Sequence, residues 1–353
     1  MKPLFFDLQR GELDEQLSAW GQPGFRARQL WHAVYVEYLS TPDQITTLPK
    51  PLRERLAASF SFSAITPERT LTSSDQQTSK VLFRLPDGHP LEAVLMVYDR
   101  RRTICISTQS GCGMNCSFCA TGQMGFFRNL TSGEIVEQVL YFARLLKEQD
   151  DRITNIVLMG MGEPFANYDA VLNAIDCLND HEGANFGERR FTISTVGVVP
   201  GIYRFADEKR QINLAVSLHA AIDDLRDKLI PMNRRYPLEE LMQACRYYVD
   251  TTHRRITFEW ALIHNVNDGL DQADAFIARV QGLNCHVNLI PLNPTSAFPG
   301  SPPEEADVNT FMQRLTQAGL SCTLRLRRGI DIQAGCGQLA AQHQGTTHSP
   351  PQP

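Results

Sequence analysis

The spacing of apolar residues divides the chain into three regions of different character. Up to about residue 70, apolar positions recur every three or four residues, which predicts short amphipathic helices over residues 12–20, 26–38 and 50–59. Residues 80–85 and 92–98 flank a turn at Pro86-Asp87-Gly88, and this pattern predicts a β-hairpin. From about residue 103, strand-like and helix-like segments alternate almost to the C-terminus.

The alternating region predicts a parallel sheet with helices packed against it. Its predicted strands span residues 103–107, 153–158, 191–194, 212–217, 256–262, 286–290 and 322–326. Its clearest helices span residues 131–147, 168–178, 238–250, 271–280 and 304–317. Repeated strand–helix units form a sheet that is either doubly wound or closed toward a barrel.

Unusual residues gather at the C-terminal ends of these predicted strands. Residues 160–164, Gly-Met-Gly-Glu-Pro, follow the second strand, and Ser194 ends the third. Residues 217–219, Ser-Leu-His, end the fourth strand, and Asn293 follows the sixth. Ligands bind at this face of parallel α/β sheets and barrels, because the βα loops surround a common crevice there. The sequence therefore predicts a binding site at this face.

We expect four parts along the chain. A helical accessory domain spans residues 1–75, a β-hairpin extension spans residues 76–100, and an α/β core spans residues 101–340. Residues 341–353 contain Gly, Thr and several Pro residues, and we expect them to form an unstructured tail.

Composition narrows the class of protein. With 353 residues, 42% hydrophobic and 21% charged, the chain has an ordinary globular composition and can bury a large core. Its longest apolar runs are much shorter than a membrane span, and charges follow the N-terminus too closely for a signal peptide. We therefore expect a cytoplasmic protein without membrane contact. A net charge of −5 limits any contact with nucleic acid to local patches.

Three of the nine cysteines form the most specific motif. An odd count in a long chain without an export signal argues against a disulfide framework. Cys112, Cys116 and Cys119 are separated by three and then two residues. A structural zinc site normally has four ligands, whereas three thiolates on a four-iron cluster leave one iron open for a small molecule. A zinc site, or three cysteines that simply pack in the core, remain alternatives.

The sequence around this motif resembles a known family. The CxxxCxxC spacing, with Phe118 before the last cysteine, is similar to that of the radical S-adenosylmethionine (SAM) superfamily. The resemblance to the methyltransferases that modify adenosine in 23S ribosomal RNA and tRNA rests on residues 25–30, 108–112, 116–122, 125–130, 160–164, 217–220 and 331–339. It covers nearly the whole chain. It implies an α/β fold, a partial (β/α)6 TIM-like barrel, with a small helical N-terminal domain and a hairpin extension.

The resemblance also implies the cofactors and their ligands. Cys112, Cys116 and Cys119 would hold a 4Fe-4S cluster, whose open iron binds SAM and whose electron cleaves it to a 5′-deoxyadenosyl radical. The SAM contacts would be Gly162 and Glu163 at the methionine part, Ser194, Ser217, Leu218 and His219 around the nucleoside, and Asn293 at the ribose or base. Two SAM molecules would be used per turnover.

Three further residues receive catalytic roles from the resemblance. Cys336 would be methylated by a first SAM, and its methylene radical would add to the adenine ring. Cys105 would release the product by forming a disulfide with Cys336, and Glu92 would take the ring proton. Without the resemblance, the residue pattern around Cys105 fits a position in the core as well as it fits a catalytic role. The pattern around Glu92 alone indicates a strand residue that faces solvent.

The remaining cysteines and one departure from the family pattern carry less weight. Cys177, Cys245, Cys285 and Cys322 lie inside helix or strand patterns, so we assign them to packing. Residues 333–335 read Gln-Ala-Gly, where the family more commonly has an acid and two alanines. Because glycine lacks a Cβ, we expect Gly335 to loosen the loop that carries Cys336.

The expected function is methylation at C2 of an adenosine in 23S rRNA near the peptidyl transferase centre, and of the adenosine 3′ to the anticodon in certain tRNAs. Methylation at C8, as in antibiotic-resistance relatives, and a non-catalytic zinc-containing RNA-binding protein are alternatives. The target base would have to leave its stack to enter the site. We expect Arg128, Arg327 and Arg328 to bind RNA phosphates, and the helices of residues 1–70 to make a second contact with RNA. We also expect flavodoxin or ferredoxin to supply electrons and the protein to be a monomer.

Overall fold

The computed structural model of the chain describes residues 2–339. Its centre is a ten-stranded sheet whose strands follow the order β1-β2-β3-β4-β7-β8-β9-β10-β11-β12. The parallel part consists of β4 (Arg101–Cys105), β7 (Asn155–Leu158), β8 (Phe191–Thr195), β9 (Asn213–Ser217), β10 (Ile256–Leu262), β11 (Cys285–Pro291) and β12 (Ser321–Leu324). Each of these strands pairs with the next one along the chain, and the order never reverses. This is the strand order of a partial, open barrel, whereas in a doubly wound sheet the order reverses.

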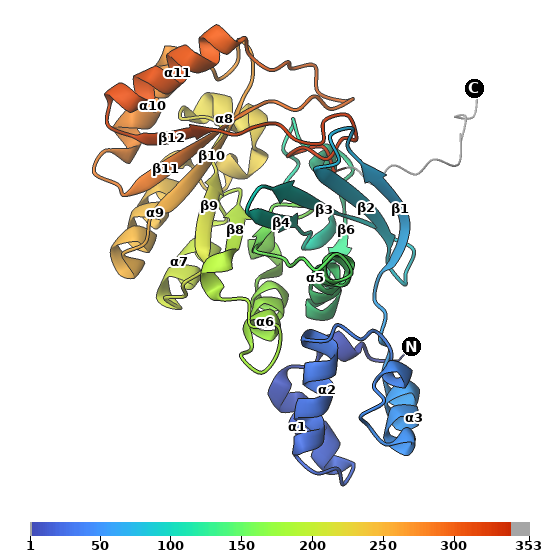
Figure 1. Cartoon of the computed structure of the whole chain (residues 1–353). Helices are drawn as coiled ribbons and strands as arrows, with labels where there is room; N and C mark the ends of the chain where they lie inside the picture. The colour runs from blue at the N-terminus through green and yellow to red at the C-terminus, as the bar shows by residue number, and fades with distance from the viewer. Residues whose placement is uncertain (1, 340–353) are drawn as a thin grey trace, which may run out of the picture.

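Helices connect the parallel strands and cover the outer side of the sheet (Figure 1). They are α5 (Ser132–Lys147), α6 (Tyr168–Asn179), α7 (Val199–Asp207), α8 (Asp223–Leu229), α9 (Leu238–Thr252), α10 (Leu270–Val280) and α11 (Glu305–Gln317). The start of α5 is fixed by a capping box: Thr131 Oγ1 accepts from the Glu134 N–H, and the Glu134 carboxylate accepts from the Thr131 N–H. Alternate residues of β10 show the resulting layers: Phe258 and Trp260 pack against Phe276 of α10, so Glu259 faces the barrel interior.

The strands before the core extend the same sheet. β2 (Thr78–Arg84) and β3 (Pro90–Tyr98) form the predicted hairpin, and β3 pairs antiparallel with β4 so that Val94 lies opposite Cys105. The sequence pattern missed β1 (Thr66–Thr72), because six of its seven residues are exposed and give no alternation. It also missed the short ribbon of β5 (Gln109–Gly111) and β6 (Phe126–Asn129) that frames the cysteine loop.

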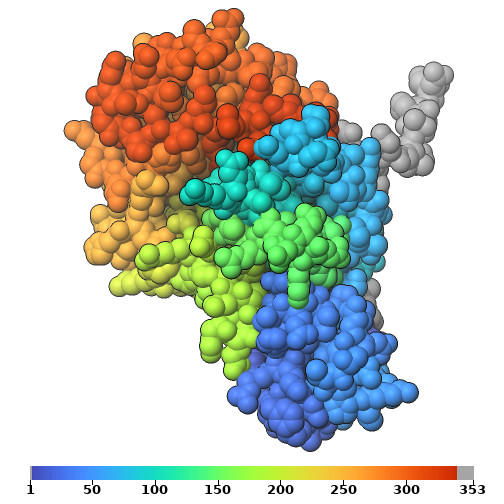
Figure 2. Space-filling view, viewed as in Figure 1, coloured from blue at the N-terminus to red at the C-terminus, as the bar shows by residue number. Residues whose placement is uncertain are grey.

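The N-terminal helices form a lobe at one end of the molecule (Figure 2). They are α1 (Arg10–Ala19), α2 (Phe25–Tyr35) and α3 (Lys50–Ser59), close to the predicted spans. The lobe meets the core at α5, where the buried Glu137 carboxylate accepts hydrogen bonds from the N–H groups of Ala64 and Ile65. The boundaries at residues 75 and 100 remain our division of the chain, and the tail expected at 341–353 lies outside the described residues.

Candidate active site

One cavity lies at the C-terminal ends of the parallel strands and collects most of the predicted site residues. Its lining includes Cys105, Cys112, Cys116, Cys119, Gly162, Glu163, Ser194, Ser217, His219, Asn293 and Cys336. Residues that are more than two hundred positions apart in the sequence therefore face a common space. The expectation that ligand-binding residues gather at this face is consistent with this arrangement.

The cysteine loop is held against both the barrel and the C-terminal segment. The Ser117 N–H donates to the Leu229 carbonyl at 2.9 Å, and the Ala120 N–H donates to the Gly337 carbonyl at 2.7 Å. Burial raises the pKa of Cys112 to about 12 and that of Cys116 well above its usual value. Three free thiols that line one cavity have the chemistry needed to ligate an iron–sulfur cluster.

Gly162 and Glu163 follow β7 and form a tight turn beside the cysteine loop. Gly162 has a φ of +102°, and a Cβ there would lie 2.6 Å from the Cβ of Gln109, so only glycine fits. The Glu163 carboxylate accepts from the N–H groups of Phe165 at 3.0 Å and Val196 at 2.8 Å. Burial raises the pKa of Glu163 to about 7, although these hydrogen bonds oppose the shift. A buried carboxylate of this kind suits an incoming ammonium group.

The residues at the ends of β8 and β9 offer groups suited to a nucleoside. Ser194 Oγ and Ser217 Oγ lie 3.3 Å apart on the adjacent strands. His219 Nδ1 accepts from the Ala261 N–H at 2.8 Å, which leaves the proton of the neutral ring on Nε2. Burial lowers the pKa of His219 to about 3. Leu218 differs from these residues: its side chain is fully buried in the core, and it is not among the residues lining the cavity.

Asn293 connects the end of β11 to the loop that carries Cys336. Asn293 Nδ2 donates to the Cys336 carbonyl at 3.1 Å. A Cβ on Gly335 would lie 2.6 Å from the same nitrogen. The missing side chain of Gly335 therefore lets Asn293 approach and hold the loop, a contact that the sequence did not indicate; that Gly335 loosens the loop stays a prediction.

Cys105 and Cys336 face the same cavity from opposite ends of the core. Both are free thiols; Cys105 is buried, whereas Cys336 is exposed. Burial raises the pKa of Cys105 to about 12, and the neighbouring Cys336 adds to the shift. The two thiols therefore lie on one cavity, close enough for the charge of one to affect the other.

Two interpretations made from local pattern need correction. Glu92 is not solvent-facing: it is 4% exposed, and Lys80 Nζ lies 3.1 Å from its carboxylate. It belongs to the same face of β3 as Met96, which lines the cavity, although Glu92 itself is not a lining residue.

Arg128 is not available for phosphates, because its guanidinium pairs with both Asp87 and Glu134. Arg327 and Arg328, in contrast, do line the cavity.

Comparisons with known proteins agree with this geometry. The family model for the radical SAM superfamily matches residues 106–277, and the model for the N-terminal domain of the ribosomal RNA large subunit methyltransferases matches residues 5–61. The "Dual-specificity RNA methyltransferase RlmN 1" of Myxococcus xanthus is 48% identical, over 95% of this chain and 94% of the relative. A Chloroflexus aurantiacus protein named "Probable dual-specificity RNA methyltransferase RlmN" is 48% identical, over 96% of this chain and 93% of the relative. The chain belongs to the RlmN family of radical SAM RNA methyltransferases.

A solved structure supports the same family assignment. The crystal structure of a radical SAM methyltransferase from Sphaerobacter thermophilus is 50% identical and superposes with a TM-score of 0.94, over 96% of this chain and all of that one. The RlmN N-terminal match covers the helical lobe, and the radical SAM match begins just after β4. In the described part of the chain, every helix is too short or too polar to span a membrane.

The sequence pattern missed Arg226, which supports the site from behind. This arginine is 1% exposed and donates to the carbonyls of Leu218 at 3.1 Å and Val196 at 2.7 Å. It therefore fixes the loops after β8 and β9 at their correct spacing. From the sequence alone, a single arginine in a helix is expected to lie on the surface, so only the tertiary contacts of Arg226 reveal this role.

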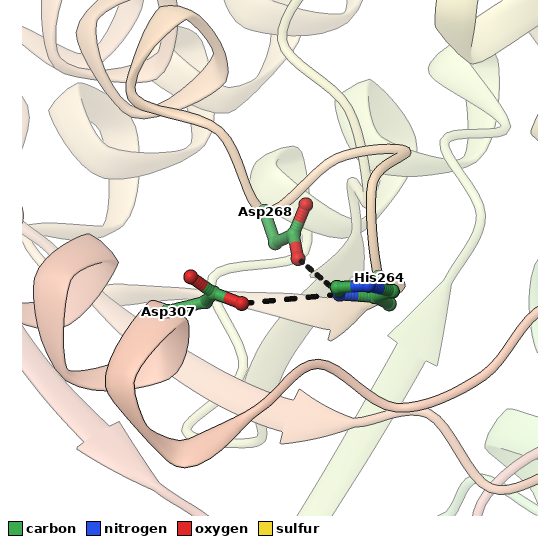
Figure 3. A group of neighbouring side chains, drawn as sticks. All are labelled: His264, Asp268 and Asp307. Carbon is green, nitrogen blue, oxygen red and sulfur yellow. Dashed lines mark ion pairs between the residues drawn. The ribbon is translucent and has the colours of Figure 1, made fainter.

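A separate cluster of His264, Asp268 and Asp307 lies outside the cavity (Figure 3). His264 Nδ1 is 3.7 Å from Asp268 and 3.8 Å from Asp307. The three residues join the loop after β10 to α11. We assign them to structural ion pairing, because nothing else in the described structure indicates a bound metal.

Proposed function

We propose that the protein methylates C2 of an adenosine in 23S rRNA near the peptidyl transferase centre, and also the adenosine 3′ to the anticodon in certain tRNAs. The single observation that carries the proposal is the meeting of the three-cysteine loop with Cys105 and Cys336 on one cavity. Family membership supports RNA methylation in general. The reactive cysteine pair supports a route through the protein's own sulfur.

In this proposal Cys112, Cys116 and Cys119 hold a 4Fe-4S cluster, and the SAM contacts are Gly162, Glu163, Ser194, Ser217, Leu218, His219 and Asn293, all of which except Leu218 line the cavity. When bound, the cluster would supply the electron that converts SAM into a 5′-deoxyadenosyl radical. Glu163 would orient the ammonium of SAM, and the Ser194–Ser217 pair would bind sugar hydroxyls. Two SAM molecules per turnover would be needed, one for the methyl group and one for the radical.

Cys336 would carry the transferred carbon. Its sulfur first receives a methyl group, and one hydrogen of that group is then removed. The resulting methylene radical adds to C2 of adenine, a carbon that is electron-poor and cannot attack SAM itself. Glu92 would take the ring proton, and the cluster, oxidised when it cleaves SAM, could accept the one electron that the adduct has to lose.

Cys105 would complete the turnover. Its thiolate attacks the Cys336 sulfur, so that an S–S bond forms while the bond between that sulfur and the transferred carbon breaks. The released carbon picks up a proton and becomes the methyl group. An external reductant must then restore both thiols, and flavodoxin or ferredoxin fits the electron supply.

The RNA would be held locally around one captured base. Arg327 and Arg328 lie at the cavity and can grip phosphates, which suits a chain whose net charge is −5. The helical lobe would provide a second RNA contact. A cytoplasmic, monomeric enzyme is part of the same proposal.

Trapping the covalent intermediate tests this function. A Cys105→Ala variant should accumulate an RNA joined to Cys336, whereas the Cys105→Ala, Cys336→Ala double variant should not. Mass spectrometry of the RNA and of the Cys336 peptide gives the readout. Unmodified Cys336 under turnover conditions, with SAM still cleaved, would rule out the cysteine route.

Two alternatives are decided by separate measurements. Mapping the modified carbon in RNA from cells with and without the protein distinguishes C2 from C8 methylation. Iron, sulfide and zinc analysis after anaerobic purification distinguishes the enzyme from a zinc-containing RNA-binding protein. One zinc and no cluster absorbance would contradict the enzyme.

A further inference from the structure

Glu259 is a buried carboxylate that the proposed function does not use. It lies in β10 and is 5% exposed. Its Oε1 accepts from Asn288 Nδ2 at 2.8 Å. Its Oε2 has no hydrogen-bond partner in the described part of the chain and lies 3.8 Å from Arg325 Nη1. A buried carboxylate with one open oxygen is costly, so its position in the active cavity needs an explanation.

Glu259 and Arg325 stand between two cavities. Both residues line the active cavity, and both also line a second cavity inside the barrel. Each parallel strand contributes a polar residue to this second cavity, namely Thr103, Asn155, Thr192, Asn213, Thr257, Asn288 and Thr323. Branched apolar residues normally fill a barrel interior, so this polar lining is a departure. It provides the hydrogen-bond partners that water needs.

Glu259 shares its cavity with both thiols of the proposed function. Asn288 approaches it from β11, Ser217 is its register partner on β9, and Arg325 faces it from the segment after β12. Tyr98 from β3 and Cys105 from β4 line the same cavity, as does Cys336. Burial raises the pKa of Glu259, and Arg325 and Asn288 oppose the shift. A carboxylate whose pKa is raised is a stronger proton acceptor than one on the surface.

The proposed function requires an acceptor for the thiol proton of Cys336. Among the described lining residues, the carboxylates are Glu163 and Glu259. Glu163 already accepts two main-chain hydrogen bonds and is assigned to the ammonium of SAM. Glu92, whose carboxylate lies 3.1 Å from Lys80 Nζ, is already assigned to the proton of the adenine ring. Glu259 is therefore the carboxylate that remains, and the polar cavity behind it gives water access.

We propose that Glu259 accepts the proton that Cys336 loses when its sulfur is alkylated, and passes that proton to water in the polar cavity. This inference rests on the proposed function. The step balances: the S–H bond of Cys336 breaks, a bond between its sulfur and the methyl carbon of SAM forms, and the methyl–sulfonium bond breaks. S-adenosylhomocysteine leaves as a neutral thioether, and the proton goes to the Glu259 carboxylate. Arg325 positions that carboxylate.

Alkylation of Cys336 by iodoacetamide tests the role without depending on turnover. The full-length protein with its cluster is treated anaerobically across a pH series, and the Cys336 peptide is quantified by mass spectrometry. Glu259→Gln keeps the shape and the acceptor for Asn288 but cannot take a proton. In this variant we expect the alkylation rate of Cys336 at neutral pH to fall about 100-fold, which is the lower end of what a positioned base contributes. The rate should recover at alkaline pH, because the thiol then loses its proton to the solvent. Glu259→Asp should retain more of the rate than Glu259→Gln.

The opposite result would overturn the proposal. If Glu259 acted only as a negative charge, its removal would ease thiolate formation, and Cys336 would react faster at neutral pH. Equal rates at every pH would also contradict it. Glu137→Gln is the matched control, because it makes the same change at a similarly buried carboxylate outside the cavity. SAM-dependent methylation of Cys336 is measured in parallel: its absence in the unsubstituted protein would contradict the proposed function, while the alkylation result still tests Glu259.

Discussion

Asn293 Nδ2 donates to the Cys336 carbonyl at 3.1 Å, so the end of β11 holds the loop that presents the reactive sulfur. Gly335 makes this contact possible, because a Cβ there would lie 2.6 Å from the donor nitrogen. The reactive cysteine is therefore positioned by a residue 43 places earlier in the chain.

We predict that Gly335→Ala displaces this loop. The added methyl group must push Asn293 away, and we expect the rate of Cys336 methylation to fall about tenfold, which corresponds to ~1.4 kcal/mol. Mass spectrometry of the Cys336 peptide gives the rate, and limited proteolysis reports the loop. Gly187→Ala is the control, because a Cβ there meets no atom within 4 Å. An unchanged rate in Gly335→Ala would mean that the loop adjusts freely.

Arg226→Met should destabilise the protein and weaken SAM binding together. The arginine is 1% exposed, and its loss leaves the buried main-chain carbonyl of Val196 and the buried side-chain carbonyl of Asn233 without the donor that Arg226 supplies to each. Orphaned carbonyls cost about 1–3 kcal/mol each, so we expect a loss of roughly 3 kcal/mol in the free energy of unfolding. Denaturant titration measures stability, and calorimetry measures SAM affinity. Arg204→Met, at a half-exposed position outside the cavity, should change neither strongly.

The sequence predicts the parts of this molecule that repeat and misses the parts that depend on tertiary contact. The strands of the barrel have apolar runs and its longer helices have periodic faces, so these were predicted to within a few residues, whereas the short helices α7 and α8 were not named. β1 was missed because a strand at the edge of the sheet, with mostly exposed residues, has no such pattern.

The residues of the active site also divide into those that local sequence predicts and those that only tertiary contacts reveal. The three cysteines could be found because their spacing is local, and Cys336 because its segment resembles a family motif. Glu92 was misread from local pattern, because the partner that helps to bury it, Lys80, is on another strand. Arg226 and Glu259 gave no local signal at all. Their roles come from carbonyls and thiols that only the fold brings near them.

The contact between the helical lobe and α5 should depend on pH. Burial raises the pKa of Glu137 to about 7 from an ordinary value of 4.5, so the folded protein keeps this proton over a range where the unfolded chain has lost it. Stability should therefore fall as pH rises from about 4.5 to 7, by at most ~1.4 kcal/mol per pH unit. Glu137→Gln removes the titration and should flatten the curve relative to the unsubstituted protein. Thermal unfolding across this range provides the measurement, and parallel curves would contradict the assignment.

Two arginines beside the active site should differ in their effect on RNA binding. Arg327 lines the cavity, and its one hydrogen bond among residues 2–339 is a long one of 3.5 Å to the Leu292 carbonyl, so its positive charge is available to a phosphate. Arg128 is already paired with Asp87 and Glu134. We expect Arg327→Gln to weaken binding of a tRNA anticodon stem-loop and to lower the slope of log affinity against log salt by about 0.7 to 0.9, the value for one phosphate contact. Arg128→Gln should leave that slope unchanged, because its charge is neutralised before RNA arrives. Filter binding over a salt series measures both slopes. A larger change for Arg128 than for Arg327 would show that the RNA breaks the ion pairs of Arg128 and approaches from the side of the cysteine loop.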